Sequence, residues 1–311
     1  MKKVAFIFPG QGSQSIGMGK DFFENSDIAK DMISKASTRL GFNFEELLFK
    51  ENENLSKTAF TQPAILLVSC IALEMFKAQC DIKPQFVLGH SLGEFSALVA
   101  SGAINYLDAI ELVHKRGLFM TEACAGAGAG MMALVGLDDE KVESLTASQR
   151  KDGKKIWAAN YNMDGQIVVA GIKADLESLV DTYKEEGAKR AIVLDMSVAS
   201  HCELLTSAIE KLNPYLNEYI TDNFDTNVIS NVTASKYNTK EEAVKLLGQQ
   251  LISPVKYKHS ILSTTSELDA LIEFGNGAVL KGLNRKIIKS IPTLNVSDMK
   301  SLEATMEKLN D

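Results

Sequence analysis

Short apolar runs alternate along the chain with longer runs of helical spacing, which is the pattern of an α/β protein. Residues 4–8 are all apolar and run into a glycine turn at 9–14, so they predict a buried strand. Residues 62–80 predict one long apolar helix that Pro63 opens. A short apolar strand, a helix-like run and an amphipathic helix then follow at 86–88, 94–100 and 106–121.

A second pattern begins after the glycine-rich stretch at 125–130. It predicts a strand, a helix, two strands, a helix and a strand, over residues 131–137, 139–149, 155–161, 166–171, 174–186 and 188–194. This β-α-β-β-α-β order is that of the ferredoxin-like motif. The chain then returns to predicted helices and strands, at 203–220 and 240–252 and at 228–230 and 270–273.

The two patterns predict a discontinuous domain that another domain interrupts. We expect residues 1–125 and 198–311 to form the first, an α/β domain, and residues 126–197 to form a small inserted α+β subdomain. A chain of 311 residues is long enough for two such units. Because binding sites favour domain interfaces, we expect the functional site where the two meet.

Composition narrows the classes of function. Thirty-three basic and 40 acidic side chains give a net charge of −7, which argues against nucleic acid as a partner. No run approaches the ~18 apolar residues of a membrane span, and the apolar start is too short for a signal peptide. The four cysteines lack C-x-x-C spacing, which argues against a zinc site. We expect a cytoplasmic monomer with no membrane contact and no bound metal.

The most informative motif is G-x-S-x-G at residues 89–93, with Ser91 at its centre. It lies between a predicted strand and a predicted helix, which is typical of a nucleophile elbow. Such a turn lifts the serine oxygen above the sheet edge, and the N–H groups of the following helix stabilise negative charge developing there. The motif also arises by chance, but this context favours a catalytic serine.

A catalytic serine needs a base, and the chain has four histidines to supply one. The side chain of His90 leaves the chain on the opposite side from Ser91, while His114 and His259 are interpreted as surface residues. His201 lies where the inserted subdomain rejoins the first domain, and is therefore the candidate base. The alternative is a structural histidine that caps the helix beginning at residue 203.

Acyl transfer also requires two N–H donors that stabilise an oxyanion. Elbow geometry supplies one from Leu92, and we expect the second from the loop at 10–12, whose glycines let the backbone approach a ligand closely. The loop does not fit a dinucleotide site, because Ser15 stands where a third glycine would be needed. We therefore expect no cofactor.

Several motifs together resemble a known family, the malonyl-CoA:acyl-carrier-protein transacylases of fatty-acid synthesis. The similar segments are FPGQGSQ at 8–14, TQPA at 61–64, GHSLGE at 89–94, NYN at 160–162, GQIVVAG at 165–171, SH at 200–201, QL at 250–251, PV at 254–255, GNG at 275–277 and VL at 279–280. They span nearly the whole chain. The resemblance implies a hydrolase-like α/β core with a parallel sheet and a nucleophile elbow, together with an inserted ferredoxin-like subdomain.

The resemblance also implies a set of catalytic residues. Ser91 would be the acylated nucleophile and His201 its base. The backbone carbonyl of Gln250 would orient His201, in place of the acid of an ordinary triad. The N–H groups of Gln11 and Leu92 would form the oxyanion hole.

Two substrate-binding residues follow from the same resemblance. Arg116 would pair with the free carboxylate of malonate, which suits a planar guanidinium that forms two hydrogen bonds, and Asn160 would lie near the entrance. Taken without the family, Arg116 is equally well a solvated helix cation. Two positions depart from the family: Ala199 replaces a usual proline, which puts the rigidity of the His201 loop in doubt, and Met163-Asp164 replaces Ser-Pro near the entrance.

The predicted reaction transfers malonyl from malonyl-CoA to the phosphopantetheine thiol of acyl carrier protein, through a malonyl-serine intermediate. Malonyl-CoA and acyl carrier protein are thus the expected partners. Because carrier proteins are acidic and this chain carries −7, docking would need a local basic surface; the densest candidate has four cations and no acid at residues 281–289. Three alternatives stay open: a serine thioesterase or esterase, an acyltransferase for another acyl-CoA, and a non-catalytic module that binds carrier protein.

Overall fold

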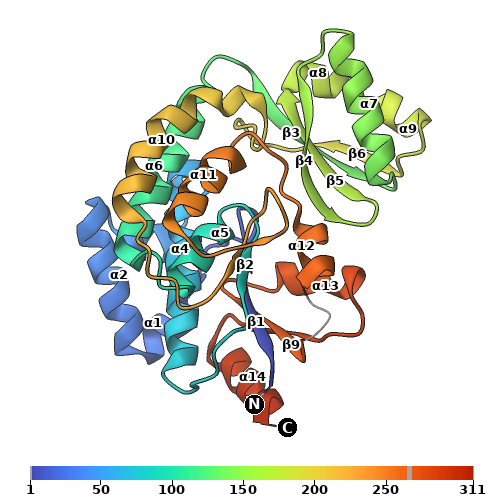
Figure 1. The fold of residues 1–311 in the computed structure, drawn as a ribbon. Coiled ribbons are helices and arrows are strands. Elements are labelled where there is room, and N and C mark those ends of the chain that lie inside the picture. The colour runs from blue at the N-terminus through green and yellow to red at the C-terminus, as the bar shows by residue number, and fades with distance from the viewer. Residues whose placement is uncertain (1, 265–267, 311) are drawn as a thin grey trace.

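The computed structural model describes residues 2–264 and 268–310, which form two β-sheets flanked by helices (Figure 1). The larger sheet has the strand order β10-β9-β1-β2-β7-β8. Its neighbouring strands are parallel except for the pair β7 and β8. The strands are β1 (Val4–Phe8), β2 (Val87–Gly89), β7 (Val228–Ile229), β8 (Lys236–Tyr237), β9 (Ala270–Phe274) and β10 (Thr293–Val296).

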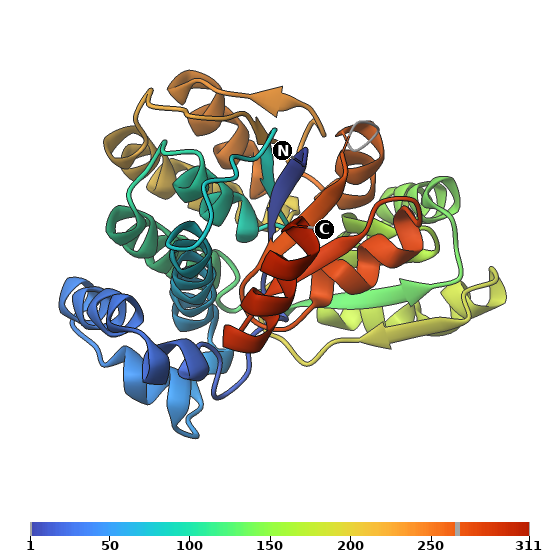
Figure 2. The ribbon, with the colours of Figure 1, turned by 90° about the horizontal axis from the view of Figure 1, so that it is seen from below.

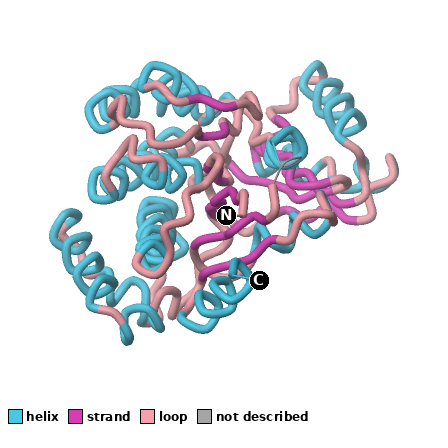
Figure 3. Tube along the Cα trace, turned by 60° about the horizontal axis from the view of Figure 1, so that its bottom comes forward, coloured by secondary structure: helices cyan, strands magenta, loops and turns pink. Residues whose placement is uncertain are grey.

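Helices cover both faces of this sheet (Figure 3), and the side chains of β1 enter the core on each of them in turn. Successive strand residues point to opposite faces. Val4, Phe6 and Phe8 therefore enter one apolar core, and Ala5 and Ile7 enter another. The helices of the larger unit are α1 (Lys20–Asn25), α2 (Asp27–Leu40), α3 (Phe44–Phe49), α4 (Thr58–Lys77), α5 (Gly93–Ala100), α6 (Tyr106–Ala123), α10 (Thr206–Tyr219), α11 (Lys240–Gln250), α12 (Tyr257–Thr264), α13 (Val279–Ile287) and α14 (Met299–Asn310).

The smaller sheet has the order β4-β5-β3-β6 with every neighbouring pair antiparallel, which is the ferredoxin-like arrangement. Its helices lie together on one face, at the opposite end of the molecule from α1 and α2 (Figures 1 and 2). The helix predicted at 174–186 is in fact two, which meet at Leu179. The elements are β3 (Ala129–Val135), α7 (Asp139–Lys151), β4 (Ile156–Met163), β5 (Gln166–Ile172), α8 (Lys173–Ser178), α9 (Val180–Glu185) and β6 (Arg190–Val193).

Helix α4 begins earlier than predicted, at Thr58, so Pro63 lies within it rather than at its start. A proline has no N–H to donate to the carbonyl four residues earlier, which here belongs to Ala59. The ring of His114 replaces that donor, with its Nδ1 2.7 Å from the Ala59 oxygen. The expectation that His114 is a surface residue is therefore wrong, because it completes the hydrogen bonding of α4.

One helix in the described part of the chain, α4, is long and apolar enough to cross a membrane by length and composition. The expectation that no run approaches such a span is therefore wrong for residues 58–77. In the structure 89% of its most apolar window is buried inside the protein, between the larger sheet and the helices around it. Its hydropathy is that of a core helix.

Candidate active site

Ser91 lies in the turn between β2 and α5, at the carboxyl end of a central strand (Figure 1). Its φ of 53° is in the left-handed region, which costs a residue other than glycine roughly 1–3 kcal/mol. The flanking glycines permit this turn: a Cβ at Gly89 would lie 1.9 Å from the carbonyl carbon of Gly93, and one at Gly93 would lie 2.1 Å from the oxygen of Phe8. No larger residue fits at either position without a backbone shift.

His201 is the histidine that reaches the serine. Its Nε2 lies 2.7 Å from Ser91 Oγ, and its Nδ1 lies 2.7 Å from the backbone oxygen of Gln250. A carbonyl oxygen only accepts hydrogen bonds, so Nδ1 carries the proton and Nε2 is free to take one from the serine. The alternative of a helix cap is wrong, since the 3-10 turn that starts at Glu203 has no side-chain cap.

The environment of His201 keeps its ring neutral. The side chain is 2% exposed, and burial together with the nearby Arg116 charge lowers its pKa from 6.5 to about 3, against the opposing effect of the Gln250 carbonyl. The residue also has a φ of 61°, so nucleophile and base both hold backbone conformations that the surrounding structure must enforce. A buried neutral imidazole is ready to accept a proton at neutral pH.

The other histidines lie outside this pair. His90 points away from Ser91, as expected, with its Nε2 2.8 Å from Asn162 Oδ1. His259 is 44% exposed at its side chain and lies 3.5 Å from Asp139, close to the expected surface position.

Arg116 is buried at the site rather than solvated, with 2% of its surface exposed. Its Nη1 donates to Gln62 Oε1 at 2.7 Å and its Nη2 to Gln250 Oε1 at 3.0 Å. Its Nε has no partner among the described residues. Burial lowers its pKa to about 10 while the Glu94 carboxylate opposes that change, so the side chain stays cationic at neutral pH. The alternative of a solvated helix cation is wrong.

Gln11 and Leu92 lie on the two loops that meet at the elbow. The His90 N–H donates to the Phe8 oxygen at 3.0 Å, and a Cβ at Gly10 would lie 2.3 Å from the oxygen of His90. The loops are thus in direct backbone contact. In the part of the chain that the structure describes, neither the Gln11 N–H nor the Leu92 N–H donates to an acceptor. Both remain available to an oxyanion.

Two hollows flank these residues, and both draw walls from the larger unit and from the segment around the small sheet. One, of about 1140 Å³, is lined by Gln11, the start of α4, the end of α6, Lys173 and residues 195–198, the segment that leads from β6 back to the larger unit. The other, of about 350 Å³, is lined by His201, α7 and β4. The site thus lies where the two units meet, as the sequence predicts.

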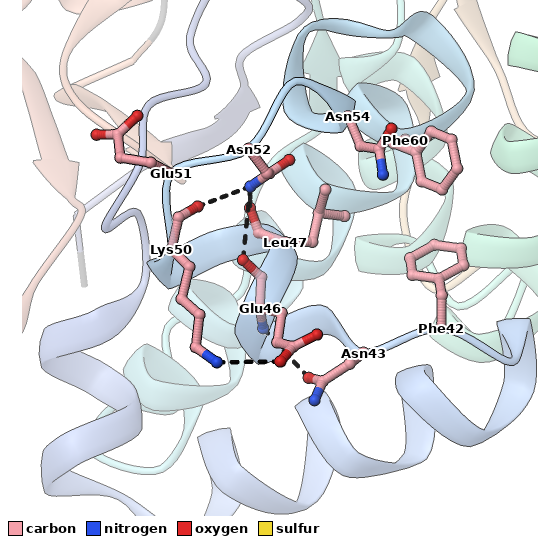
Figure 4. A pocket seen from close by; sticks show the side chains of 9 residues that line it. All are labelled: Phe42, Asn43, Glu46, Leu47, Lys50, Glu51, Asn52, Asn54 and Phe60. Carbon is pink, nitrogen blue, oxygen red and sulfur yellow. Dashed lines mark hydrogen bonds and ion pairs between the residues drawn. The ribbon is translucent and has the colours of Figure 1, made fainter.

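A third hollow of about 350 Å³, beside α3, has no comparable chemistry (Figure 4). Two of its side-chain amides are hydrogen-bonded to nearby backbone groups. Asn52 donates to the oxygens of Leu47 and Lys50, and Asn43 accepts from the N–H of Glu46. Lys50 is paired with the Glu46 carboxylate at 3.0 Å.

Sequence reasoning missed Asn231, which clamps the elbow. Its Oδ1 accepts from the Ser91 N–H at 2.6 Å and its Nδ2 donates to the Gly89 oxygen at 2.7 Å. It directly follows Ser230 at the carboxyl end of β7, and β7 is parallel to β2, so the two strand ends meet at one sheet edge. The sequence signal that could have indicated Asn231 is its place as a polar residue just after the apolar run at 228–229.

No cluster of three or more histidine, cysteine, aspartate or glutamate side chains suited to a metal occurs within residues 2–264 and 268–310. The four thiols are free, and those of Cys70, Cys124 and Cys202 are buried. Burial raises the pKa of the Cys202 thiol to about 12, so this neighbour of His201 does not act as a nucleophile.

Comparison with known proteins places this site in a family. A family model described as an acyl transferase domain matches residues 5–306. The chain belongs to the acyl transferase family. It is 41% identical over 313 residues to the malonyl CoA-acyl carrier protein transacylase of Bacillus subtilis, covering 100% of this chain and 98% of the relative. It is 37% identical over 309 residues to that of Staphylococcus aureus strain COL, covering 99% of each.

Solved structures agree with this assignment. The malonyl-CoA:acyl carrier protein transacylase of Helicobacter pylori superposes with a TM-score of 0.96 at 44% identity, covering 100% of this chain and 99% of that one. A malonyl-transacylase solved in complex with a type II PKS acyl-carrier protein superposes with a TM-score of 0.94 at 34% identity, covering 98% of this chain and 99% of that one. These similarities confirm the predicted α/β fold with its small antiparallel sheet.

The two departures of this acyltransferase from its family differ in burial. Ala199 is fully buried, and its backbone oxygen faces Cys124 Sγ at 3.8 Å. Asp164 is exposed, and it pairs at 3.0 Å with Lys258, which is 8% exposed. Asn160 lies in β4 opposite Val255 and is 6% exposed.

Proposed function

We propose that this acyltransferase moves the malonyl group of malonyl-CoA to the phosphopantetheine thiol of acyl carrier protein, through a malonyl ester on Ser91. The observation that carries the proposal is a buried arginine beside a serine–imidazole–carbonyl chain: Arg116 and His201 both contact Gln250. A desolvated guanidinium favours an acyl group that ends in a carboxylate. The names of the relatives at 37–41% identity agree with this substrate.

The first half-reaction makes the ester. Ser91 Oγ transfers its proton to His201 Nε2 and bonds to the thioester carbon, whose oxygen takes the negative charge. The N–H groups of Gln11 and Leu92 stabilise that charge. The carbon–sulfur bond then breaks, and the imidazolium returns its proton to the sulfur of leaving CoA.

The second half-reaction reverses the roles with a new thiol. The carrier thiol gives its proton to His201, its sulfur bonds to the ester carbon, and the carbon–oxygen bond to Ser91 breaks as the proton returns to Oγ. Proton transfer and oxyanion stabilisation account for the chemistry, so we propose that no metal or redox cofactor takes part. Water must be kept from the ester, which suits a site between two units. We also propose that the protein acts as a monomer in the cytoplasm.

An acceptor-dependence assay tests this function against that of a thioesterase. Malonyl-CoA is incubated with the enzyme, with and without acyl carrier protein, and free CoA and malonyl-carrier are measured. The proposal predicts malonyl-carrier as the product and, without acceptor, release of about one CoA per enzyme followed by slow turnover. Malonate release at a rate that acceptor does not change would contradict it. The neutral Gln250 carbonyl beside His201, where a hydrolase triad has an acid, favours the transferase.

Carrier protein docking gives a separate prediction. The four cations of residues 281–289 are all exposed; they are Lys281, Arg285, Lys286 and Lys289. The first three lie on α13, which ends at Ile287, and Lys289 lies just beyond it. The double variant Lys286→Glu, Lys289→Glu is expected to raise the KM for carrier protein and flatten its salt dependence. Acylation by malonyl-CoA should stay unchanged, because it needs no protein partner.

The same charge reversal on a remote helix is the control. Lys30→Glu with Lys35→Glu changes two exposed cations of α2, each paired only with its own helix. That variant should leave the KM for carrier protein near the wild-type value. Equal effects of the two double variants, or a loss of acylation in the first, would remove the docking role of α13.

The low pKa of His201 predicts an unusual pH profile. An ordinary imidazole loses its basic form as the pH falls through 6.5, whereas this one stays neutral until about pH 3. Labelling of Ser91 by a fluorophosphonate should therefore keep its rate from pH 8 to pH 5.5. Unfolded His201 binds a proton below pH 6.5 and the folded form does not, so stability should fall over the same range. A rate that halves near pH 6.5 would contradict the neutral buried base.

A further inference from the structure

Glu94 is a buried carboxylate one turn after the nucleophile, on the first turn of α5. Its exposed fraction is 0%, which is rare for a glutamate unless its oxygens are fully hydrogen-bonded. Oε2 accepts from the Asn231 N–H at 3.0 Å and from Gln250 Nε2 at 2.8 Å. Oε1 accepts from the Tyr237 hydroxyl at 3.0 Å.

The first of these partners holds the nucleophile from its amino side. Asn231 bonds the Ser91 N–H and the Gly89 oxygen with its side-chain amide, so it spans the strained turn. The Glu94 bond to the Asn231 backbone fixes the peptide from which that amide extends. A shift of Asn231 would release the left-handed conformation of Ser91.

The second partner joins three parts of the site. The side chain of Gln250 donates to the backbone oxygen of Ser91 at 3.1 Å as well as to Glu94, and its Oε1 accepts from Arg116. Its backbone oxygen accepts from the base. The orientation of Gln250 therefore sets the nucleophile, the base and the substrate-binding cation at once.

We propose that Glu94 is a positioning residue, whose Oε2 fixes Asn231 and Gln250 and through them the nucleophile, the base and the carboxylate-binding arginine. The role rests on the proposed acyl transfer, because it serves the same serine. Glu94 acts through the length of its side chain and the hydrogen bonds that its oxygen accepts, rather than through its negative charge. Both donors meet one oxygen, and a neutral amide oxygen in the same place would accept them equally.

The surroundings of the carboxyl group agree with a role that does not need charge. Burial raises the pKa of Glu94 to about 7, against the opposing effects of its donors and of Arg116. A proton on Oε1 would point to the Tyr237 oxygen, which accepts as well as donates. The two bonds at Oε2 are the same in either protonation state.

Two variants separate reach from charge. Glu94→Gln keeps the length and removes the charge, whereas Glu94→Asp keeps the charge and withdraws the oxygen by one methylene. The measured quantity is the rate of fluorophosphonate labelling of Ser91, which needs the nucleophile, base and oxyanion hole but no malonyl-CoA. Glu94→Gln should label near the wild-type rate, and Glu94→Asp about 10²-fold more slowly, the size of effect that a misplacement near 1 Å can have.

Glu273 supplies the matched control. It is a second carboxylate with 0% exposure and a pKa that burial raises to about 7, but it accepts from the N–H groups of Leu280 and Lys281 at the start of α13. Glu273→Asp should lower the melting temperature and leave the labelling rate of the folded protein unchanged. It thereby reports the effect of shortening a buried carboxylate that does not hold the site.

The outcomes are distinct. Slow labelling of Glu94→Asp together with near wild-type labelling of Glu94→Gln supports the proposal. Slow labelling of Glu94→Gln would overturn it, because the charge would then be needed whether or not Glu94→Asp is slow as well, and wild-type labelling by folded Glu94→Asp would show that Glu94 only stabilises the fold. Because labelling needs no acyl donor, wild-type protein that labels but fails to form malonyl-serine would refute the proposed substrate and leave the positioning role standing.

Discussion

Replacing His201 with alanine is expected to slow acylation of Ser91 by malonyl-CoA by about 10²-fold or more, because no other base contacts the serine oxygen in the described structure. The imidazole is neutral and already within hydrogen-bond distance, so its removal takes away the proton acceptor itself. Release of CoA in a rapid-mixing experiment without acceptor measures the effect. The melting temperature of the variant shows whether the fold is kept.

His259→Ala is the matched control for that variant. Its ring is partly exposed, faces Asp139 and lies outside the site. Acylation should proceed near the wild-type rate. An His201→Ala protein that folds and acylates as fast as His259→Ala would remove His201 from the mechanism.

Replacing Arg116 with alanine should cost about 2–5 kcal/mol in the efficiency of malonyl transfer. The variant removes the buried cation that would pair with the malonate carboxylate and leaves the Gln62 and Gln250 oxygens without their donor. Transfer from acetyl-CoA, which has no second carboxylate, should change little or improve. The ratio of kcat/KM for the two substrates within one variant measures selectivity independently of any general loss of activity.

Lys115→Ala controls for the loss of a cation on the same helix. Lys115 pairs with Glu111 and lies over the ring of Tyr215, away from the buried site. It should leave the malonyl-to-acetyl ratio unchanged. If Arg116→Ala lowered transfer from both substrates equally, the arginine would support the fold rather than select the acyl group.

Regular elements with strong periodicity could be predicted from the sequence alone. The strand at 4–8 and the β-α-β-β-α-β run are found within a few residues of their predicted places, because their apolar patterns match one buried face. The sequence patterns do not predict the elements between residues 15 and 55, nor β8, α12, β10 and α14. The sequence predicts Pro63 at a helix start because a proline lacks the N–H that a position inside a helix needs. In the structure the ring of His114, 51 residues further along the chain, bonds the Ala59 oxygen instead, and no local pattern reveals that contact.

The site was predictable as far as local motifs define it. The glycines around Ser91 encode the turn, and the structure brings Ser91, His201 and Gln250 together as the family resemblance implies. The supporting contacts are tertiary and leave no periodic trace. Asn231 and Glu94 meet across 137 positions, and the burial of Arg116 depends on the packing of α4 against α6.

Formation of malonyl-Ser91 is the central claim, and intact-mass measurement tests it most directly. Wild-type protein, Ser91→Ala and His259→Ala are each mixed with malonyl-CoA without acceptor, and the mass is recorded before and after addition of acyl carrier protein. The account predicts one malonyl group on wild type and on His259→Ala, none on Ser91→Ala, and loss of the adduct when carrier is added. No adduct on the wild-type protein, or the same adduct on Ser91→Ala, would contradict it.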